Sequence, residues 1–201
     1  MTRIIGIFVF DDVELLDLAG PYEVFTCASR VHARLNPGTE IPFKMLTVGQ
    51  TSAPSRARAG LGVLPDAGFA DHSNIDVLVV PGGVVTAELS KPEVIAWIAK
   101  TARGSELTTS VCTGAFLLAQ AGLLADKRAT THWEDMDDLQ SMFPDVEVVR
   151  DKRWVRDGNT VTSGGISAGI DMSLHLVETL VNRELALRTA HQMEYAWNEN
   201  A

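Results

Sequence analysis

The feature that most constrains the fold is a repeated alternation of short apolar runs with longer segments of helical periodicity. The runs IIGIFVF (4–10) and DVLVV (76–80) are almost continuously apolar, which is typical of strands buried on both faces. Each is followed by apolar residues at helical spacing, in LAGPYEVFTCASRV (18–31) and KPEVIAWIAKTARG (91–104). This alternation predicts an α/β protein with a mostly parallel sheet sandwiched by helices.

The same patterns predict the other elements. Asp157-Gly158-Asn159, between the β-branched runs of 153–163, is typical of a hairpin and adds an antiparallel piece. The Gly-, Ser- and Pro-rich segment 48–64 indicates turns and a short hairpin rather than a linker. The length of 201 residues fits one domain spanning residues 1–201. Further strands are expected at 43–48, 61–65, 106–111 and 146–149, and further helices at 113–124, 134–143, 167–181 and 183–198.

Charge and hydropathy exclude several classes of function. The formal net charge is −9, and the sequence contains no cluster of Lys and Arg residues. We therefore expect no nucleic-acid or anionic-membrane partner. No apolar run is long enough for a membrane span. The N-terminal MTRIIGIFVF is followed at once by Asp11 and Asp12, which favours a first strand over a signal peptide. We therefore expect a cytoplasmic protein.

Chemistry-bearing residues stand where the predicted strands end. Asp17 follows the first strand, Gly82-Gly83 follow DVLVV, Cys112 follows ELTTSV, and Gly164-Gly165 follow NTVTS. In an open parallel sheet the carboxyl ends of the strands meet at one edge, and sites form there. These residues are therefore expected to converge although they are far apart in the sequence.

Cys112 lies between a predicted strand and a predicted helix, with Ser110 and Gly114 two residues away on either side. Small neighbours allow the sharp strand-to-helix turn of a nucleophile elbow. At a helix N-terminus the thiolate would meet unpaired N–H groups, so its pKa is expected to fall. The alternative is a small buried hydrophobe, which is the interpretation we favour for Cys27. The spacing of the two cysteines does not fit a metal site.

Other residues near these strand ends admit two interpretations each. Gly82-Gly83 could direct N–H groups at a developing negative charge, or form an ordinary turn. Asp17 could cap the helix that follows it, or act as an acid/base if it lies near Cys112. His132 could form a Cys–His couple. Its neighbours in ATTHWED indicate a helix start with Trp133 as a wall, which favours a pocket-lining role for His132.

Five motifs in this order resemble the PfpI/ThiJ superfamily, whose fold is flavodoxin-like and of the class I glutamine-amidotransferase type. They are DLAGPYEVF, VVPGG, SVCTGAFLLAQAGLL, KRATTHW and VRDGNTVTSGGISAGID, which together run from Asp17 to Asp171. Within the superfamily the sequence is most similar to isocyanide (isonitrile) hydratases, and it is also similar to the sensing domains of AraC-type regulators.

The resemblance implies a cofactor-independent, metal-free enzyme that acts on a small neutral organic substrate and forms homodimers. It implies that Cys112 is the nucleophile and Asp17 its acid/base, and that water is added to an isocyanide through a covalent thioimidate. The protease-like branch has His directly after the nucleophile and other branches have Glu in place of Asp17, so both positions favour the hydratase branch. Further site residues implied are the backbone donors Gly82, Gly83 and Thr113, with Ile166 at the pocket border.

Two other functions remain open at this stage. A ligand- or oxidant-sensing protein would carry a reactive thiol without turnover, since low-pKa thiolates oxidise readily. A regulator would also need a DNA-binding segment, which we do not expect in this acidic chain. A glyoxalase-like enzyme acting on reactive carbonyls would use the same cysteine.

Overall fold

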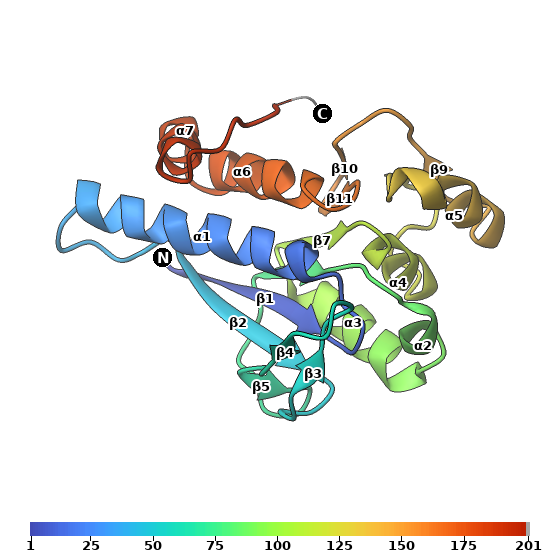
Figure 1. The fold of residues 1–201 in the computed structure, drawn as a ribbon. Helices are drawn as coiled ribbons and strands as arrows, with labels where there is room; N and C mark the ends of the chain where they lie inside the picture. The colour runs from blue at the N-terminus through green and yellow to red at the C-terminus, as the bar shows by residue number, and fades with distance from the viewer. Residues whose placement is uncertain (200–201) are drawn as a thin grey trace.

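The computed structural model describes residues 1–199 and contains a seven-stranded sheet with the order β10-β11-β7-β6-β1-β2-β5 (Figure 1). Every neighbouring pair is parallel except β10 and β11, which form the hairpin predicted at 153–163. The strands are β1 (Arg3–Val9), β2 (Phe43–Gly49), β5 (Ala67–Gly68), β6 (Val77–Val80), β7 (Leu107–Val111), β10 (Trp154–Asp157) and β11 (Thr160–Ser163).

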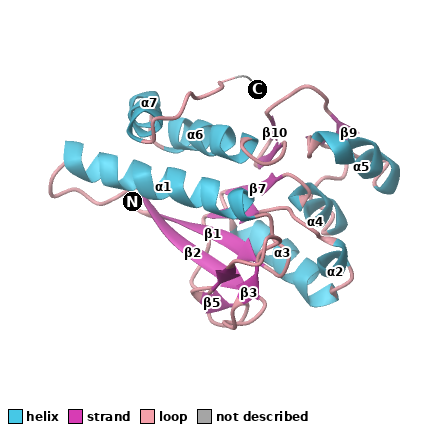
Figure 2. Ribbon diagram, in the orientation of Figure 1, coloured by secondary structure: helices cyan, strands magenta, loops and turns pink. Residues whose placement is uncertain are grey.

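Helices cover both faces of the sheet, which confirms the predicted α/β sandwich. Helices α1, α6 and α7 form one group, and α2, α3 and α4 gather on the other side of the strands (Figures 1 and 2). The helices are α1 (Leu15–Leu35), α2 (Thr86–Leu89), α3 (Pro92–Gly104), α4 (Gly114–Gln120), α5 (Met136–Met142), α6 (Ala168–Leu180) and α7 (Arg183–Gln192), with a 3-10 turn η1 (Trp133–Asp135) before α5.

Two short two-stranded pieces lie outside the main sheet. The antiparallel pair β3 (Ser55–Arg56) and β4 (Gly62–Val63) is the hairpin expected within 48–64. The parallel pair β8 (Arg128–Ala129) and β9 (Glu147–Val148) connects the segments on either side of α5.

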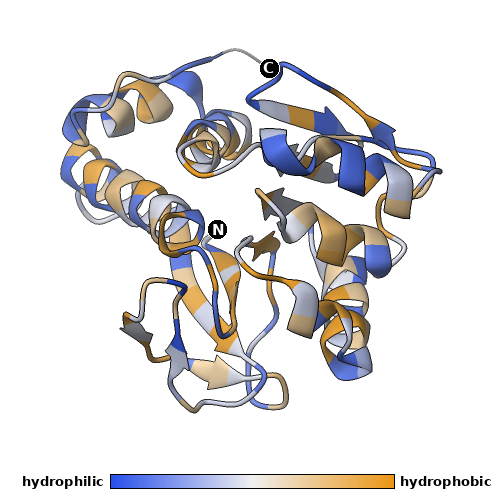
Figure 3. Cartoon of the chain, turned by 45° about the vertical axis from the view of Figure 1, so that its right-hand side comes forward, coloured by the Kyte–Doolittle hydropathy of each residue, from blue (hydrophilic) through white to orange (hydrophobic). Residues whose placement is uncertain are grey.

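The central strands are buried because helices cover both of their faces. All residues of β6 and β7 are buried, and hydrophobic residues concentrate in the strands at the centre of Figure 3. Burying a continuous apolar run of this kind removes it from water on both sides of the sheet. No helix within residues 1–199 is long and apolar enough to cross a membrane.

Several helix boundaries differ from the sequence expectation. Helix α1 begins at Leu15, three residues before the expected start, so Pro21 lies inside the helix instead of in its first turn. Helix α4 ends at Gln120, and Gly122 then adopts a left-handed φ of 72°. Helix α7 ends at Gln192, because the chain turns away near Glu194, whose φ is +50°.

Residues 193–199 therefore form an irregular strap instead of the end of the helix expected over 183–198. The strap is held by the buried Asp171: its side chain accepts from the Asn198 N–H at 2.9 Å, and its carbonyl accepts from Trp197 Nε1 at 3.1 Å. The amphipathic pattern of this stretch reflects contact with the core by Tyr195 and Trp197.

Candidate active site

Four strands whose ends carry the candidate residues are consecutive neighbours in the sheet, in the order β11-β7-β6-β1. They are mutually parallel, so their carboxyl ends meet at one edge. The sheet therefore brings together Cys112, Asp17 and the two glycine pairs that follow β6 and β11.

Cys112 occupies a sharp turn between β7 and α4. Its φ is +56°, a left-handed conformation that is unusual for a residue with a side chain and is often found where strain serves a site. Hydrogen bonds fix its backbone: its N–H donates to the Ser163 carbonyl at 3.1 Å, and its carbonyl accepts from Thr131 Oγ1 at 2.8 Å. A Cβ on Gly114 would lie 2.1 Å from the Val80 carbonyl oxygen, so the turn requires glycine there.

Asp17 lies in the first turn of α1 and is completely buried. The residue that caps the helix is Glu14, so the interpretation of Asp17 as an N-cap is wrong. The Asp17 Oδ2 accepts from the Gly82 N–H at 3.0 Å, whereas Oδ1 is buried without a conventional hydrogen-bond partner. Burial raises the pKa of the carboxyl to about 7, and hydrogen bonds from the Gly82 N–H and the Cys112 thiol partly oppose that rise.

Burial also raises the pKa of the Cys112 thiol, to about 12, and the nearby charge of Asp17 raises it further. The backbone N–H of Thr113 acts in the opposite direction. This result differs from the expectation of a lowered thiol pKa at a helix N-terminus. Only 7% of Cys112 is exposed, and removal of water outweighs the helix dipole at that depth. The resting pair therefore holds a thiol.

The loop after β6 is held in place by Thr113 and by the loop after β1. Thr113 Oγ1 accepts from the Gly83 N–H and donates to the Gly83 carbonyl, both at 2.9 Å. Gly83 has a φ of 136°, and a Cβ there would lie 2.2 Å from the Asp12 carbonyl oxygen. The N–H groups of Gly82 and Gly83 are thus already engaged, unlike the free donors expected from the sequence. Their evident effect is to hold Asp17 and Thr113 beside Cys112.

A cavity of about 490 Å³ opens above Cys112. Of the predicted residues, Gly83, Thr113, His132 and Ile166 line it with Cys112, while Asp17 and Gly82 are not among its lining residues. The remaining lining residues are Glu14, Arg58, Val84, Val85, Thr86, Leu89, Phe116, Glu134, Asp135, Asp138 and Met142.

His132 and Trp133 lie on different sides of the wall between two cavities. His132 precedes η1, and its Nδ1 accepts from the Glu134 N–H at 3.4 Å and lies 3.4 Å from Asp135 Oδ2. Trp133 is 73% exposed and lines a second cavity of about 500 Å³, so its expected place in the Cys112 pocket is wrong. The two residues are adjacent in the sequence but line different cavities, because the backbone turns between them.

Gly165 is a site residue whose detailed role the sequence could not reveal. A Cβ on Gly165 would lie 2.9 Å from Cys112 Sγ and 2.3 Å from His132 Cδ2. The backbone at Gly165 therefore lies too close to these two side chains for any residue other than glycine to fit without displacing one of them. Arg58 and Asp135 were also missed as lining residues, because nothing in their local sequence links them to this edge of the sheet. The only signal for Gly165 is its position after a strand.

Comparisons with known proteins agree with this architecture. Residues 3–179 match the DJ-1/PfpI family. An isonitrile hydratase from Pseudomonas putida is 39% identical over 198 residues, which is 98% of this chain and 80% of that protein. The HTH-type transcriptional regulator GbdR from Pseudomonas aeruginosa is 30% identical over 95% of this chain but only 50% of its own length. The crystal structure of a THiJ/PfpI family protein from Pseudomonas syringae superimposes with a TM-score of 0.86 at 29% identity, over 98% of this chain and 77% of that chain.

Proposed function

This chain belongs to the DJ-1/PfpI family, and on that premise we propose that it is a cysteine-dependent hydro-lyase that adds water to an isocyanide to give an N-substituted formamide. The observation that carries the proposal is the buried pair formed by Cys112, which lines the cavity, and Asp17, which is completely buried next to it. The 39% identity to an isonitrile hydratase over nearly the whole chain supports the choice of reaction.

The first step of the proposed mechanism adds the thiol across the terminal carbon of the isocyanide. The Cys112 proton passes to the Asp17 carboxylate as the sulfur attacks that carbon, and Asp17 delivers the proton to the same carbon. One C–S bond and one C–H bond form, and the S–H bond breaks. The product is a thioimidate, and Asp17 is again a carboxylate.

The second step adds water to the thioimidate. Asp17 takes a proton from the water molecule as the water oxygen attacks the carbon, and it passes that proton to the substrate nitrogen, so that a neutral tetrahedral species with an N–H and a hydroxyl group forms. As this species collapses, Asp17 takes the hydroxyl proton, the C–S bond breaks and the formamide is released. The sulfur recovers a proton from Asp17, so the sum of the two steps is isocyanide plus water giving formamide.

Two features of the site support this division of roles. A carboxyl with a pKa of about 7 can both accept and donate a proton near neutral pH, which suits a group that does each once in the cycle. The buried Asp17 Oδ1 has no conventional hydrogen-bond partner and is available for a transferring proton. Neither step calls for a cofactor. The proposed enzyme is a homodimer, which light scattering on the purified protein tests.

Formamide production from cyclohexyl isocyanide by the wild type, Cys112→Ala and Asp17→Asn tests the proposal. We expect turnover by the wild type and loss of turnover in both variants. Absence of turnover by the folded wild type would overturn the hydratase assignment, and full activity of Cys112→Ala would overturn the mechanism. If the wild type does not hydrate the isocyanide, two further assays distinguish the alternatives. Lactate formation from methylglyoxal would identify a glyoxalase, and an increase in intact mass from oxidation of Cys112 by mild peroxide would identify a thiol sensor.

A further inference from the structure

The cavity above Cys112 is far larger than the reacting group. An isocyano group has two heavy atoms, whereas the cavity of about 490 Å³ lies in the range of sites that hold drug-sized ligands. Most of the cavity must therefore hold the R group of the substrate. Val85, Leu89 and Phe116 provide apolar lining for it.

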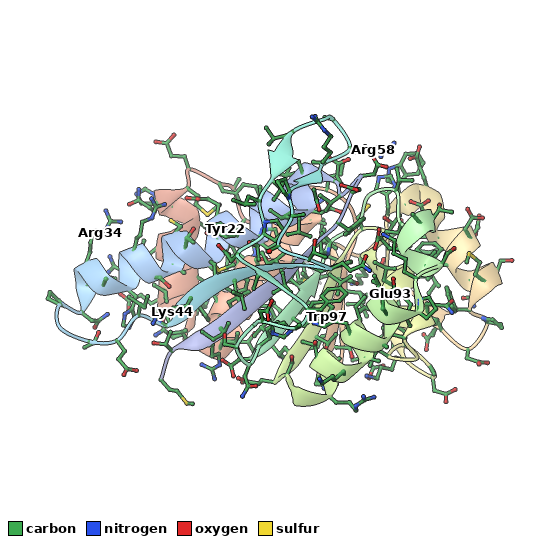
Figure 4. The ribbon with its side chains drawn as sticks, turned by 90° about the horizontal axis from the view of Figure 1, so that it is seen from below. Tyr22, Arg34, Lys44, Arg58, Glu93 and Trp97 are labelled. Carbon is green, nitrogen blue, oxygen red and sulfur yellow. The ribbon has the colours of Figure 1, made fainter. Side chains whose placement is uncertain are left out.

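The charged lining is strongly unbalanced. Four carboxyl groups and one guanidinium line the cavity, which gives an excess of three formal negative charges with His132 neutral. The single guanidinium, Arg58, comes from the β3–β4 hairpin (Figure 4). It lies 3.7 Å from Glu14, one of the four carboxylates. The one guanidinium of the lining therefore already lies near a carboxylate of the same cavity.

The other three carboxyl groups come from η1 and α5 and form one side of the cavity, which we call the acidic wall: Glu134, Asp135 and Asp138. Glu134 and Asp135 lie 3.6 and 3.4 Å from His132 Nδ1. The carboxylate of Asp138 is exposed and makes no hydrogen bond or ion pair with any residue in the range 1–199. Asp138 is thus the carboxylate best placed to receive a cation from a ligand.

The nearest cluster of basic residues does not neutralise the acidic wall. Arg150 and Arg153 line the second cavity, on the Trp133 side, together with Gly164 and Gly165. Both have their own carboxylates: Arg150 pairs with Asp137, and Arg153 pairs with the buried Asp171. The second cavity is lined by Arg150, Lys152 and Arg153 with one carboxylate, Asp151, so its formal lining charge is opposite in sign to that of the cavity above Cys112.

We infer that the site selects isocyanides whose R group is apolar near the isocyano carbon and ends in a cationic ammonium group that lies against the acidic wall. The reaction in this inference rests on the proposed function, whereas the preference for a cationic R group rests on the charged residues that line the cavity. A carboxylate-bearing isocyanide is disfavoured, because it would meet an excess of negative charge in a partly desolvated space.

The preference can be measured without turnover, by the rate at which Cys112 reacts with charged methanethiosulfonates. The thiolate attacks the reagent's sulfenyl sulfur, a disulfide forms and methanesulfinate leaves. Rates for the trimethylammonium-ethyl and the sulfonato-ethyl reagents are each divided by the rate with free 2-mercaptoethanol. Cys112→Ala confirms the site of modification, since the other cysteine, Cys27, is completely buried and does not line the cavity. We expect the cationic reagent to be favoured about tenfold at low salt.

Charge variants locate the source of the preference. Asp138→Asn and Glu134→Gln should each reduce the ratio of cationic to anionic rates about twofold to threefold, and Arg58→Gln should increase it. Asp71→Asn removes an exposed carboxylate that lines neither cavity and should leave the ratio unchanged. A wild-type ratio of one or less, or a ratio that does not respond to Asp138→Asn and Glu134→Gln, would overturn the inference.

A matched substrate series separates this inference from the reaction itself. The series is pentyl isocyanide, 5-aminopentyl isocyanide and 5-isocyanopentanoate, compared by kcat/KM for formamide formation. The inference expects the order ammonium, neutral, carboxylate. Equal turnover of all three would overturn the preference and leave the hydratase intact, whereas a cationic preference in thiol modification without any turnover would support the cavity chemistry and overturn the hydratase.

Discussion

Asp17 and Cys112 lie against each other at the carboxyl edge of the sheet, where bulk water has little access to either group. Burial raises the pKa of both, to about 7 for the carboxyl and about 12 for the thiol, and the charge of Asp17 raises the thiol pKa further. The pair therefore holds one proton above neutral pH and two below it, and its titration belongs to both residues together.

This proton count predicts the pH dependence of the reaction. The form with one proton is competent, because Asp17 must be a carboxylate to accept the thiol proton. We expect kcat/KM to fall about tenfold per pH unit below pH 7 and to reach a plateau above it. The profile is measured from pH 5 to 9 at constant ionic strength. A rate that decreases as the pH rises through 7 would show instead that the doubly protonated pair is active.

Asp17→Asn should change two properties in opposite directions. Without the negative charge the thiol pKa falls, so alkylation of Cys112 by iodoacetamide at pH 8 should become faster. Hydration should fall by about 100-fold or more, because an amide cannot shuttle the proton. Circular dichroism checks that the variant is folded. A loss of both alkylation and hydration would mean that Asp17 is needed for the structure and not for proton transfer.

The fold was largely predictable because its signals are local and repeated. A buried strand such as DVLVV is recognisable from its continuous apolar composition. Because parallel strands are joined by helical crossovers, the alternation of such strands with helices predicts a parallel sheet covered by helices. The match of residues 3–179 to the DJ-1/PfpI family confirms the resemblance drawn from the motifs. Element ends were less predictable: the strap at 193–199 depends on Asp171, which is distant in the sequence.

Details of the site depend on relationships that no local pattern contains. The raised pKa of Cys112 comes from the depth of burial, which outweighs the dipole that the sequence suggested. The opposite orientations of His132 and Trp133 follow from the backbone turn at η1. The engagement of both glycine N–H groups follows from the side chains of Asp17 and Thr113, which approach from other strand ends.

Gly165 and Gly164 offer a matched pair of substitutions. A Cβ on Gly165 would lie 2.9 Å from Cys112 Sγ and 2.3 Å from His132 Cδ2, so Gly165→Ala must displace one of them. We expect kcat/KM to fall about tenfold or more. A Cβ on Gly164 would have its nearest neighbour at 3.6 Å, an ordinary contact, so Gly164→Ala should retain activity within a few-fold. Equal effects of the two substitutions would contradict the close approach of Gly165 to the thiol.

The hydroxyl of Thr113 ties the elbow to the loop after β6. Thr113→Val leaves the N–H and carbonyl of Gly83 without that partner, which should lower the free energy of unfolding by about 1–3 kcal/mol and reduce kcat. Thr113→Ser keeps the hydroxyl and should retain most of both properties. Urea unfolding and steady-state kinetics measure the two effects. Wild-type stability and kcat in Thr113→Val would remove Thr113 from the supporting structure of the site.

The central claim is that Cys112 attacks the isocyanide carbon, and rapid quenching followed by intact-protein and peptide mass spectrometry tests it most directly. During turnover of cyclohexyl isocyanide we predict a transient adduct whose added mass equals one molecule of substrate. The adduct should lie on the peptide that contains Cys112 and should be absent in Cys112→Ala. Formamide formation with no adduct on Cys112 at any quench time, or with undiminished rate in Cys112→Ala, would contradict the account.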